Sequence, residues 1–222
     1  SVLDEAGVPR EEVRGLIVGR GPGSFTGVRI AAATAKGLAR GLDVPVRLYS
    51  SLAAGAASAG AWIPDVLQSD SEGLGETGPA EPSENRNGLG SGSEAGLGNR
   101  PVYVLFDARG ERTYAACYRH RDSSMETLSA PRATTISELL AADVPEGTIF
   151  CGDGALRHSG TLLKAGYSVL GPPAGLPTAE GLLWLNAVVP DLGVQPEDAR
   201  WEPDYLRSSS ARPASRLEGR AV

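Results

Sequence analysis

The first sixty residues alternate short apolar runs with Ala-rich stretches of helical periodicity. Four successive apolar or small residues, Gly15-Leu16-Ile17-Val18, lack polar alternation and indicate a buried strand. Ser24 or Thr26 is the expected N-cap of the helix that follows, Gly41 its expected C-cap, and Ser50 the N-cap of a second helix. The predicted elements are a strand at 15–19, a helix at 27–40, a strand at 44–49 and a helix at 50–61. This order indicates an α/β architecture with parallel strands.

The same patterning resumes at residue 101. Two apolar runs flank Ala108-Arg109-Gly110 and predict a β-hairpin of 102–106 with 113–119, in which Gly110 supplies the permissive turn position. The remaining predicted elements are strands at 126–130, 148–151 and 168–170, and helices at 137–142, 155–165 and 178–189. The second half is therefore also α/β, and it opens with an antiparallel hairpin.

Residues 64–100 differ in kind from the segments on either side. They contain eight Gly, five Ser, three Pro, three Asn and no aromatic residue, and their net charge is −5. Such a composition cannot bury enough apolar surface to offset its chain entropy, so we predict a disordered insertion. The Ser/Arg/Ala-rich tail at 208–222 is expected to be flexible. The expected organisation is a partial first half at 1–63, the insertion, and a second half at 101–207.

Composition narrows the class of protein. The chain has 222 residues, 41% of them hydrophobic, and a net charge of −6 without a dense basic stripe, which makes it a poor candidate for binding nucleic acid by itself. Cys117 and Cys151 lie in apolar runs without a CxxC pattern and are expected to be reduced core thiols, with a disulfide or a nucleophile as alternatives. No signal peptide or membrane-spanning run is found, so we expect a cytoplasmic protein. The first residues resemble the end of a helix, and we expect preceding residues to be missing.

The glycine-rich stretch from Gly19 to Arg29 is the most unusual feature of the sequence. A strand is expected before it and a helix after it, which is where backbone N–H groups can bind an anion. A P-loop would need a Lys after the last glycine, where Val28 stands, and Gly21, Gly23 and Gly27 miss the dinucleotide-binding spacing by one residue. A kinase glycine loop would join two strands. Only a weak anion-site hypothesis is left.

The helix after this loop has small residues at intervals of four. Gly27, Ala31, Ala35 and Ala39 would line one face, which another helix could approach closely. Two interpretations are open at this point: packing on the protein's own sheet, or docking of a partner helix.

The residues from Gly21 to Ile30, GPGSFTGVRI, closely resemble the GPGSFTGLRIG signature of the TsaB (YeaZ) family. Three shorter matches follow in the family's order. They are the hairpin Asp107-Ala108-Arg109 with Glu111 and Tyr114, the turn Gly152-Asp153-Gly154-Ala155, and the closing Pro203-Asp204-Tyr205-Leu206-Arg207. The ten-residue signature is specific, whereas each of the others is weak alone.

The resemblance implies a fold of two RNase H-like halves of the actin/Hsp70/sugar-kinase (ASKHA) type, with the first half incomplete here. It implies a non-catalytic dimerisation subunit for the synthesis of threonylcarbamoyladenosine at position 37 of tRNA. Such a subunit binds the catalytic subunit TsaD, which the ATPase TsaE joins, and it meets tRNA only through the complex; a homodimer is a further expectation. The expected partner-binding residues are Gly27, Arg29, Ala31, Ala35 and Ala39, next to the signature loop Gly21-Pro22-Gly23-Ser24-Phe25-Thr26-Gly27.

The rival function is a stand-alone nucleotide-binding enzyme or a glycoprotease-like peptidase. His120 and His158 are 38 residues apart and offer no HxxxH pair, so neither a metal site nor a catalytic residue is expected. The turn at Gly152, Asp153 and Gly154 is interpreted either as a plain turn or as a nucleotide contact. No cofactor is expected for the chain alone, while ATP or ADP is expected at an interface of the complex.

Overall fold

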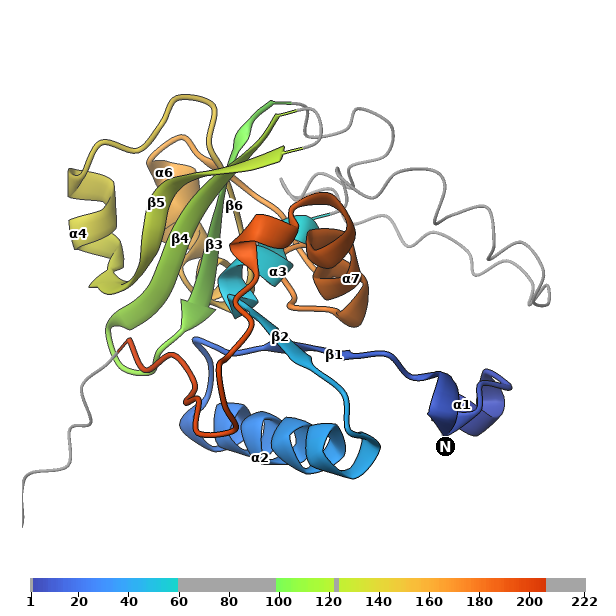
Figure 1. The fold of residues 1–222 in the computed structure, drawn as a ribbon. Coiled ribbons are helices and arrows are strands. Elements are labelled where there is room, and N and C mark those ends of the chain that lie inside the picture. The colour runs from blue at the N-terminus through green and yellow to red at the C-terminus, as the bar shows by residue number, and fades with distance from the viewer. Residues whose placement is uncertain (1, 60–98, 122–123, 207–222) are drawn as a thin grey trace, which may run out of the picture.

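The computed structural model describes residues 2–59, 99–121 and 124–206, and it contains a small sheet and a large one (Figure 1). The small sheet pairs β1 (Leu16–Gly19) with β2 (Val46–Tyr49) in parallel. The large sheet has the order β5-β4-β3-β6-β7. The predicted mixed α/β fold class is confirmed. Apart from Asn99 and Arg100, the residues of the two segments predicted to be disordered, 64–100 and 208–222, lie outside the described ranges.

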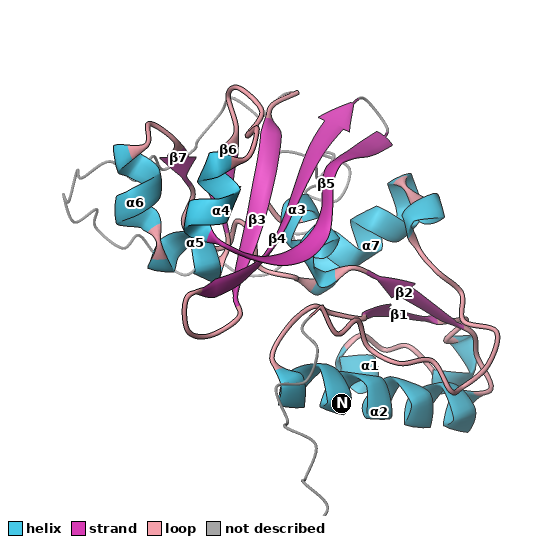
Figure 2. Ribbon diagram, turned by 90° about the vertical axis from the view of Figure 1, so that its left-hand side faces the viewer, coloured by secondary structure: helices cyan, strands magenta, loops and turns pink. Residues whose placement is uncertain are grey.

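The long helix α2 (Phe25–Leu42) lies below the small sheet and connects its two strands (Figure 2). Ser24 is its N-cap, as predicted: the Ser24 side chain accepts a hydrogen bond from the backbone N–H of Gly27 at 3.0 Å. The predicted C-cap was wrong, because Gly41 lies inside the helix. The chain leaves the helix at Asp43, which adopts the left-handed conformation with φ of 54°.

The large sheet combines both strand directions. Strands β3 (Pro101–Asp107), β4 (Arg112–Arg121) and β5 (Ser124–Thr135) are antiparallel, whereas β6 (Ile149–Cys151) and β7 (Ser168–Val169) continue from β3 in parallel. The predicted hairpin is confirmed, and both Arg109 and Gly110 have positive φ in its turn. Strand β5 extends well beyond the predicted 126–130. It contains Pro131, which has no N–H to donate. Pro131 lies where the register with β4 shifts, so no regular ladder hydrogen bond is lost there.

Helices cover both faces of the large sheet (Figure 2). On one face α3 (Ser51–Ala57) and α7 (Ala179–Val188) pack over a core that contains Leu52, Val104 and Trp184. The other face buries Leu105, Leu139 and Phe150, and the remaining helices there are α4 (Ile136–Ala141), α5 (Asp153–Arg157) and α6 (Ser159–Lys164). A single helix had been predicted at 155–165, but it breaks at His158, before the poor helix formers Ser159 and Gly160.

Three short segments complete the described chain. Helix α1 spans Val2–Glu5, and the 3-10 turns η1 and η3 span Arg10–Glu12 and Pro190–Leu192. After η3 the chain runs back from the large sheet to the small sheet and α2 (Figure 1). This return places residues from the far end of the sequence beside the signature loop.

Candidate docking site on helix α2

The signature loop connects β1 to α2, and the backbone at its start is hydrogen-bonded within the chain. The N–H of Arg20 donates to the carbonyl of Tyr49 at 2.8 Å, and the N–H of Gly21 donates to the Ser51 hydroxyl at 3.1 Å. The N–H of Ser51 in turn donates to the carbonyl of Gly21 at 2.8 Å. Gly21 has a φ of 106°, which L side chains rarely adopt. Gly21 therefore serves a tight strand-to-helix connection, in which the N–H groups of Arg20, Gly21 and Gly27 are already hydrogen-bonded. An anion site at the start of α2 stays a prediction.

The four small residues predicted to share a face of α2 wind around the helix. Gly27 and Ala31 are exposed, Ala35 is buried and Ala39 is half-buried. An α-helix turns 100° per residue, so a step of four residues advances by about 40° and the row drifts from solvent towards the protein's own sheet. The end of this row at Ala35 and Ala39 therefore packs towards the protein's own sheet, while docking of a partner at its exposed end, Gly27 and Ala31, stays a prediction.

A different set of residues forms the outward face of α2, and these residues are apolar or small. Ile30 is 61% exposed and Leu38 is 49% exposed. Ala33 is also exposed, and a Cβ added to Gly37 or Gly41 would meet no atom within 4 Å. Spacings of three and four residues, rather than four alone, would have found this face in the sequence.

We expect Ala35→Glu to destabilise the fold rather than to test docking. Ala35 is 5% exposed on the inner side of α2, so a carboxylate there would be buried without a partner, at a cost of about 2–4 kcal/mol. Chemical denaturation followed by circular dichroism measures the loss. Ala31→Glu is the matched control: Ala31 is exposed on the same helix, and we expect its substitution to change the free energy of unfolding by less than about 0.5 kcal/mol.

The segment of residues 201–206, here called the closing segment, fastens the signature loop and α2 from outside. The N–H of Asp204 donates to the carbonyl of Arg20 at 2.8 Å, and the two side chains form an ion pair at 2.9 Å that lacks hydrogen-bond alignment. Burial raises the pKa of Asp204, and the Arg20 guanidinium offsets this only in part. The Lys36 ammonium lies 4.9 Å from the centre of the Trp201 ring. The signature loop and α2 are therefore held by the C-terminal end of the described chain.

Arg29 lies near two aromatic rings, one from α2 itself and one from the closing segment. Its guanidinium carbon lies 3.8 Å from the centre of the Phe25 ring and 5.7 Å from that of Tyr205. Its Nε donates to the Tyr205 hydroxyl at 3.1 Å. The sequence placed Arg29 among the partner-binding residues, but it gave no sign that Tyr205, 176 positions away, would hold it.

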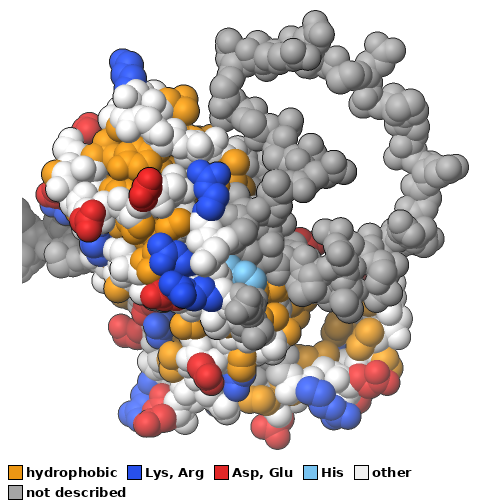
Figure 3. All heavy atoms as spheres, turned by 90° about the horizontal axis from the view of Figure 1, so that it is seen from above, with side chains coloured by type: hydrophobic (Ala, Val, Ile, Leu, Met, Phe, Trp, Pro, Cys, Tyr) orange, Lys and Arg blue, Asp and Glu red, His pale blue; other side chains and the backbone are white. Residues whose placement is uncertain are grey.

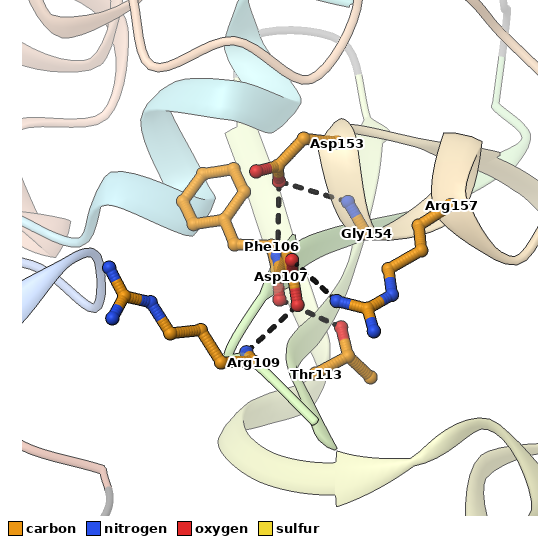
Figure 4. Close-up of polar contacts among 7 residues, drawn as sticks. All are labelled: Phe106, Asp107, Arg109, Thr113, Asp153, Gly154 and Arg157. Atoms are coloured by element: carbon orange, nitrogen blue, oxygen red, sulfur yellow. Dashed lines mark hydrogen bonds and ion pairs between the residues drawn. The ribbon is translucent and has the colours of Figure 1, made fainter. Parts of the chain in front are cut away.

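The predicted turn at Gly152, Asp153 and Gly154 packs against β3 (Figure 4). Oδ1 of Asp153 accepts hydrogen bonds from the N–H groups of Asp107 at 3.1 Å and of Gly154 at 2.9 Å. A Cβ on Gly152 would meet the carbonyl oxygen of Leu105. These contacts give all three turn residues a role in joining α5 to β3, and the nucleotide contact stays a prediction.

Asp107, at the end of β3, accepts hydrogen bonds from the β3–β4 turn and from helix α5 (Figure 4). Its carboxylate takes one from the N–H of Arg109 at 2.8 Å and forms an ion pair with Arg157 at 2.7 Å. Partial burial raises the pKa of Asp107, but these two partners outweigh it and hold the pKa below its ordinary value. The ion pair joins the end of β3 to Arg157 on α5.

We expect Asp107→Asn to cost about 0.5–1 kcal/mol at pH 7, because the ion pair is partly exposed and Asn can keep the bond from Arg109. The lowered pKa of Asp107 means that its stabilisation exists above the unfolded-state pKa, about 3.9, and is lost as the pH falls through the folded-state pKa. Urea unfolding of parent and variant should therefore differ at pH 7 and converge once the pH is below the folded-state pKa of Asp107. A difference that persists at low pH would contradict the role of the charge; Asp143→Asn, at an exposed position, is the control.

The candidate catalytic side chains are dispersed. Cys117 and Cys151 contribute to cores on opposite faces of the large sheet, and burial raises the pKa of each thiol to about 12, as expected of core cysteines. His120 and His158 are half-buried, and the His120 ring lies 5.6 Å from that of Trp184. Within the described ranges no three His, Cys, Asp or Glu side chains gather as metal ligands would.

The rest of the described surface offers a pocket and a face of mixed charge. A pocket of about 340 Å³ lies beside the small sheet, between Ile17, Arg47 and Asn186. Seen from above, one face of the molecule has basic and acidic side chains interspersed with apolar ones over the part drawn in colour (Figure 3). Among the described helices, none is both long and apolar enough to cross a membrane.

Known proteins resemble this chain, one curated relative over nearly its whole length and two others over a shorter part. The TsaB protein of Bacillus subtilis, named for tRNA threonylcarbamoyladenosine biosynthesis, is 41% identical over 216 residues, which cover 95% of this chain and 77% of that protein. The Escherichia coli TsaB is 36% identical over 107 residues, or 46% of each chain. The match to the Haemophilus influenzae TsaB spans 25% of that protein, so the aligned parts cover less than half of these last two relatives.

A family model described as TsaD, tRNA N6-adenosine threonylcarbamoyltransferase, matches residues 1–67. A solved structure from Pseudomonas aeruginosa, titled as similar to peptidase YEAZ, has 27% identity and a TM-score of 0.61, and the match covers 93% of this chain and 79% of that one. A second, titled YeaZ from the same organism, matches with a TM-score of 0.60 and 27% identity.

The fold and these structural neighbours define a mixed α/β protein of the RNase H-like, ASKHA type, with an exposed helix after a glycine-rich turn. The chain belongs to the TsaB family, as its signature loop had indicated.

Proposed function

We propose that this chain is the dimerisation subunit for synthesis of threonylcarbamoyladenosine in tRNA, and that it docks TsaD through the outward face of α2. TsaD carries the reaction, TsaE joins the assembly, and tRNA meets this chain only through the complex. The proposal assigns no cofactor to the chain alone and places ATP or ADP at an interface of the complex.

The observation that carries this proposal is an apolar, small-residue face of α2 that is open in a TsaB family member. Ile30 and Leu38 expose side chains that a globular protein ordinarily buries, while Gly37 and Gly41 leave the helix backbone accessible between them. Small residues allow two helices to approach closely, and exposed apolar neighbours supply the area to bury. The match of residues 1–67, which include α2, to the TsaD family supports a related helix as the partner.

Co-purification with TsaD from the organism that encodes this chain is the direct test. A tagged form of the chain should retain TsaD on a column and elute with it as one complex in size-exclusion chromatography. Adding the chain to TsaD should raise the yield of modified tRNA, whereas the chain alone should turn over neither ATP nor peptide. Absence of a complex, or turnover by the chain alone, would overturn the proposal.

A further inference from the structure

Arg29 has the geometry of a prearranged binding group on the docking helix. Its guanidinium lies against the Phe25 ring, and its Nε is committed to the Tyr205 hydroxyl at 3.1 Å. That bond is the one hydrogen bond it makes among the described residues, which leaves its two terminal amino groups for another acceptor. Arg29, Phe25 and Tyr205 are all exposed, with Phe25 at 57% and Tyr205 at 42%.

We infer that Arg29, fixed by Phe25 and Tyr205, binds a carboxylate of the protein that docks on α2. This inference rests on the proposed function, because it assumes a protein partner at that face. A guanidinium presents parallel N–H donors that match a carboxylate, and a side chain already held in place loses little entropy on binding. Arginine and aromatic side chains are also the residue types that contribute most to protein interfaces.

The charge of α2 supports an acidic partner. The helix carries Arg29, Lys36 and Arg40, and no Asp or Glu lies between Phe25 and Leu42. A cationic helix face attracts a partner surface of opposite sign and disfavours one of like sign. A nucleic-acid phosphate could also pair with Arg29. The apolar Ile30 next to Arg29 and the net charge of −6 favour a protein instead.

Affinity measurements on single variants test the inference. With TsaD as the partner, Arg29→Ala should weaken binding by about 10- to 100-fold, because a charge-assisted pair is lost. Arg29→Lys should recover part of this loss, since it keeps the charge without the two parallel donors. Lys164→Ala, at an exposed position on α6, is the control and should bind as the parent does.

Tyr205→Phe separates positioning from direct contact. It keeps the ring and removes the hydroxyl that accepts from Arg29, so we expect about a 3-fold loss of affinity from a less ordered guanidinium. The same substitution made in an Arg29→Ala background should have no further effect. An equal loss in both backgrounds would show that Tyr205 acts without Arg29 and would overturn the positioning role.

Carbodiimide cross-linking identifies the acceptor. In the Arg29→Lys variant, position 29 should join to an Asp or Glu of TsaD, a link that mass spectrometry of the digested complex would locate. If the parent binds TsaD and Arg29→Ala binds equally well, the inference fails while the proposed function stands. Loss of a tRNA cross-link with unchanged TsaD affinity would assign Arg29 to a phosphate and would also overturn it. Failure of the parent to bind TsaD overturns the proposed function itself.

Discussion

Replacing Gly37 with Gln is expected to weaken the complex with TsaD by at least about 100-fold while leaving this protein folded. Gly37 lies midway along the outward face of α2, where an added Cβ would meet no atom within 4 Å of the chain itself. A long side chain at that point would hold a partner helix away from the small-residue surface, and the contacts on either side would be lost together. Gln adds bulk without charge, so a loss of binding would report on close approach alone.

The fold of the Gly37→Gln variant should become slightly more stable. Gln has a better helix propensity than Gly in an exposed helix interior, and we expect a gain of about 0.5–1 kcal/mol in denaturant unfolding. Gly160→Gln is the matched control, because Gly160 lies in α6 and also has open space beside it. Titration calorimetry against TsaD measures both variants. Unchanged binding by Gly37→Gln would show that this face is not the docking surface.

The Gly152→Ala variant is expected to lose about 4 kcal/mol or more of folding free energy, enough to unfold a protein of ordinary stability. Gly152 has a φ of 93° and ψ of 167°, a backbone region that is nearly exclusive to glycine. An added Cβ would also meet the carbonyl oxygen of Leu105 in the central strand β3, which cannot move aside. The added Cβ would therefore strain the backbone of residue 152 and overlap with the Leu105 carbonyl oxygen at the same time.

Equilibrium unfolding in urea, followed by tryptophan fluorescence, measures this loss. Gly160→Ala is the control and should gain about 0.5–1 kcal/mol, because its Cβ enters open space within a helix. A Gly152→Ala variant that loses less than about 1 kcal/mol would mean that the turn can move away from β3. In that case the structural account of the Gly152-Asp153-Gly154 turn would be wrong.

Local signals in the sequence were sufficient for the elements that build the site. The uninterrupted apolar run before the glycine loop predicted β1, and the turn around Gly110 predicted the hairpin. Ser24 was one of the two N-caps expected for α2, with Thr26, and it is the one that caps the helix. Each of these rests on contacts within a few residues. The end of α2 was misplaced because Gly41 carried the usual C-cap signal, whereas Asp43 adopts the left-handed conformation.

The site itself was harder to predict because its contacts are distant in sequence. A four-residue spacing placed Ala35 and Ala39 on the docking face, but 3.6 residues per turn carries them inward. Nothing near Arg29 or Arg20 indicates that Tyr205 and Asp204 would reach them, since side-chain pairs across such separations leave no periodic signal. The ion pair of Asp107 with Arg157 was missed for the same reason.

The contact between Arg29 and Tyr205 also sets an order of events during protein synthesis. The two residues are 176 positions apart, so the ribosome adds Tyr205 roughly 9–35 s after Arg29 at common elongation rates. Helix α2 and its small sheet can form in that interval, but the closing segment does not yet exist to hold Arg29 in place. A nascent chain therefore lacks part of the proposed docking surface, which is complete only after both sheets have been translated.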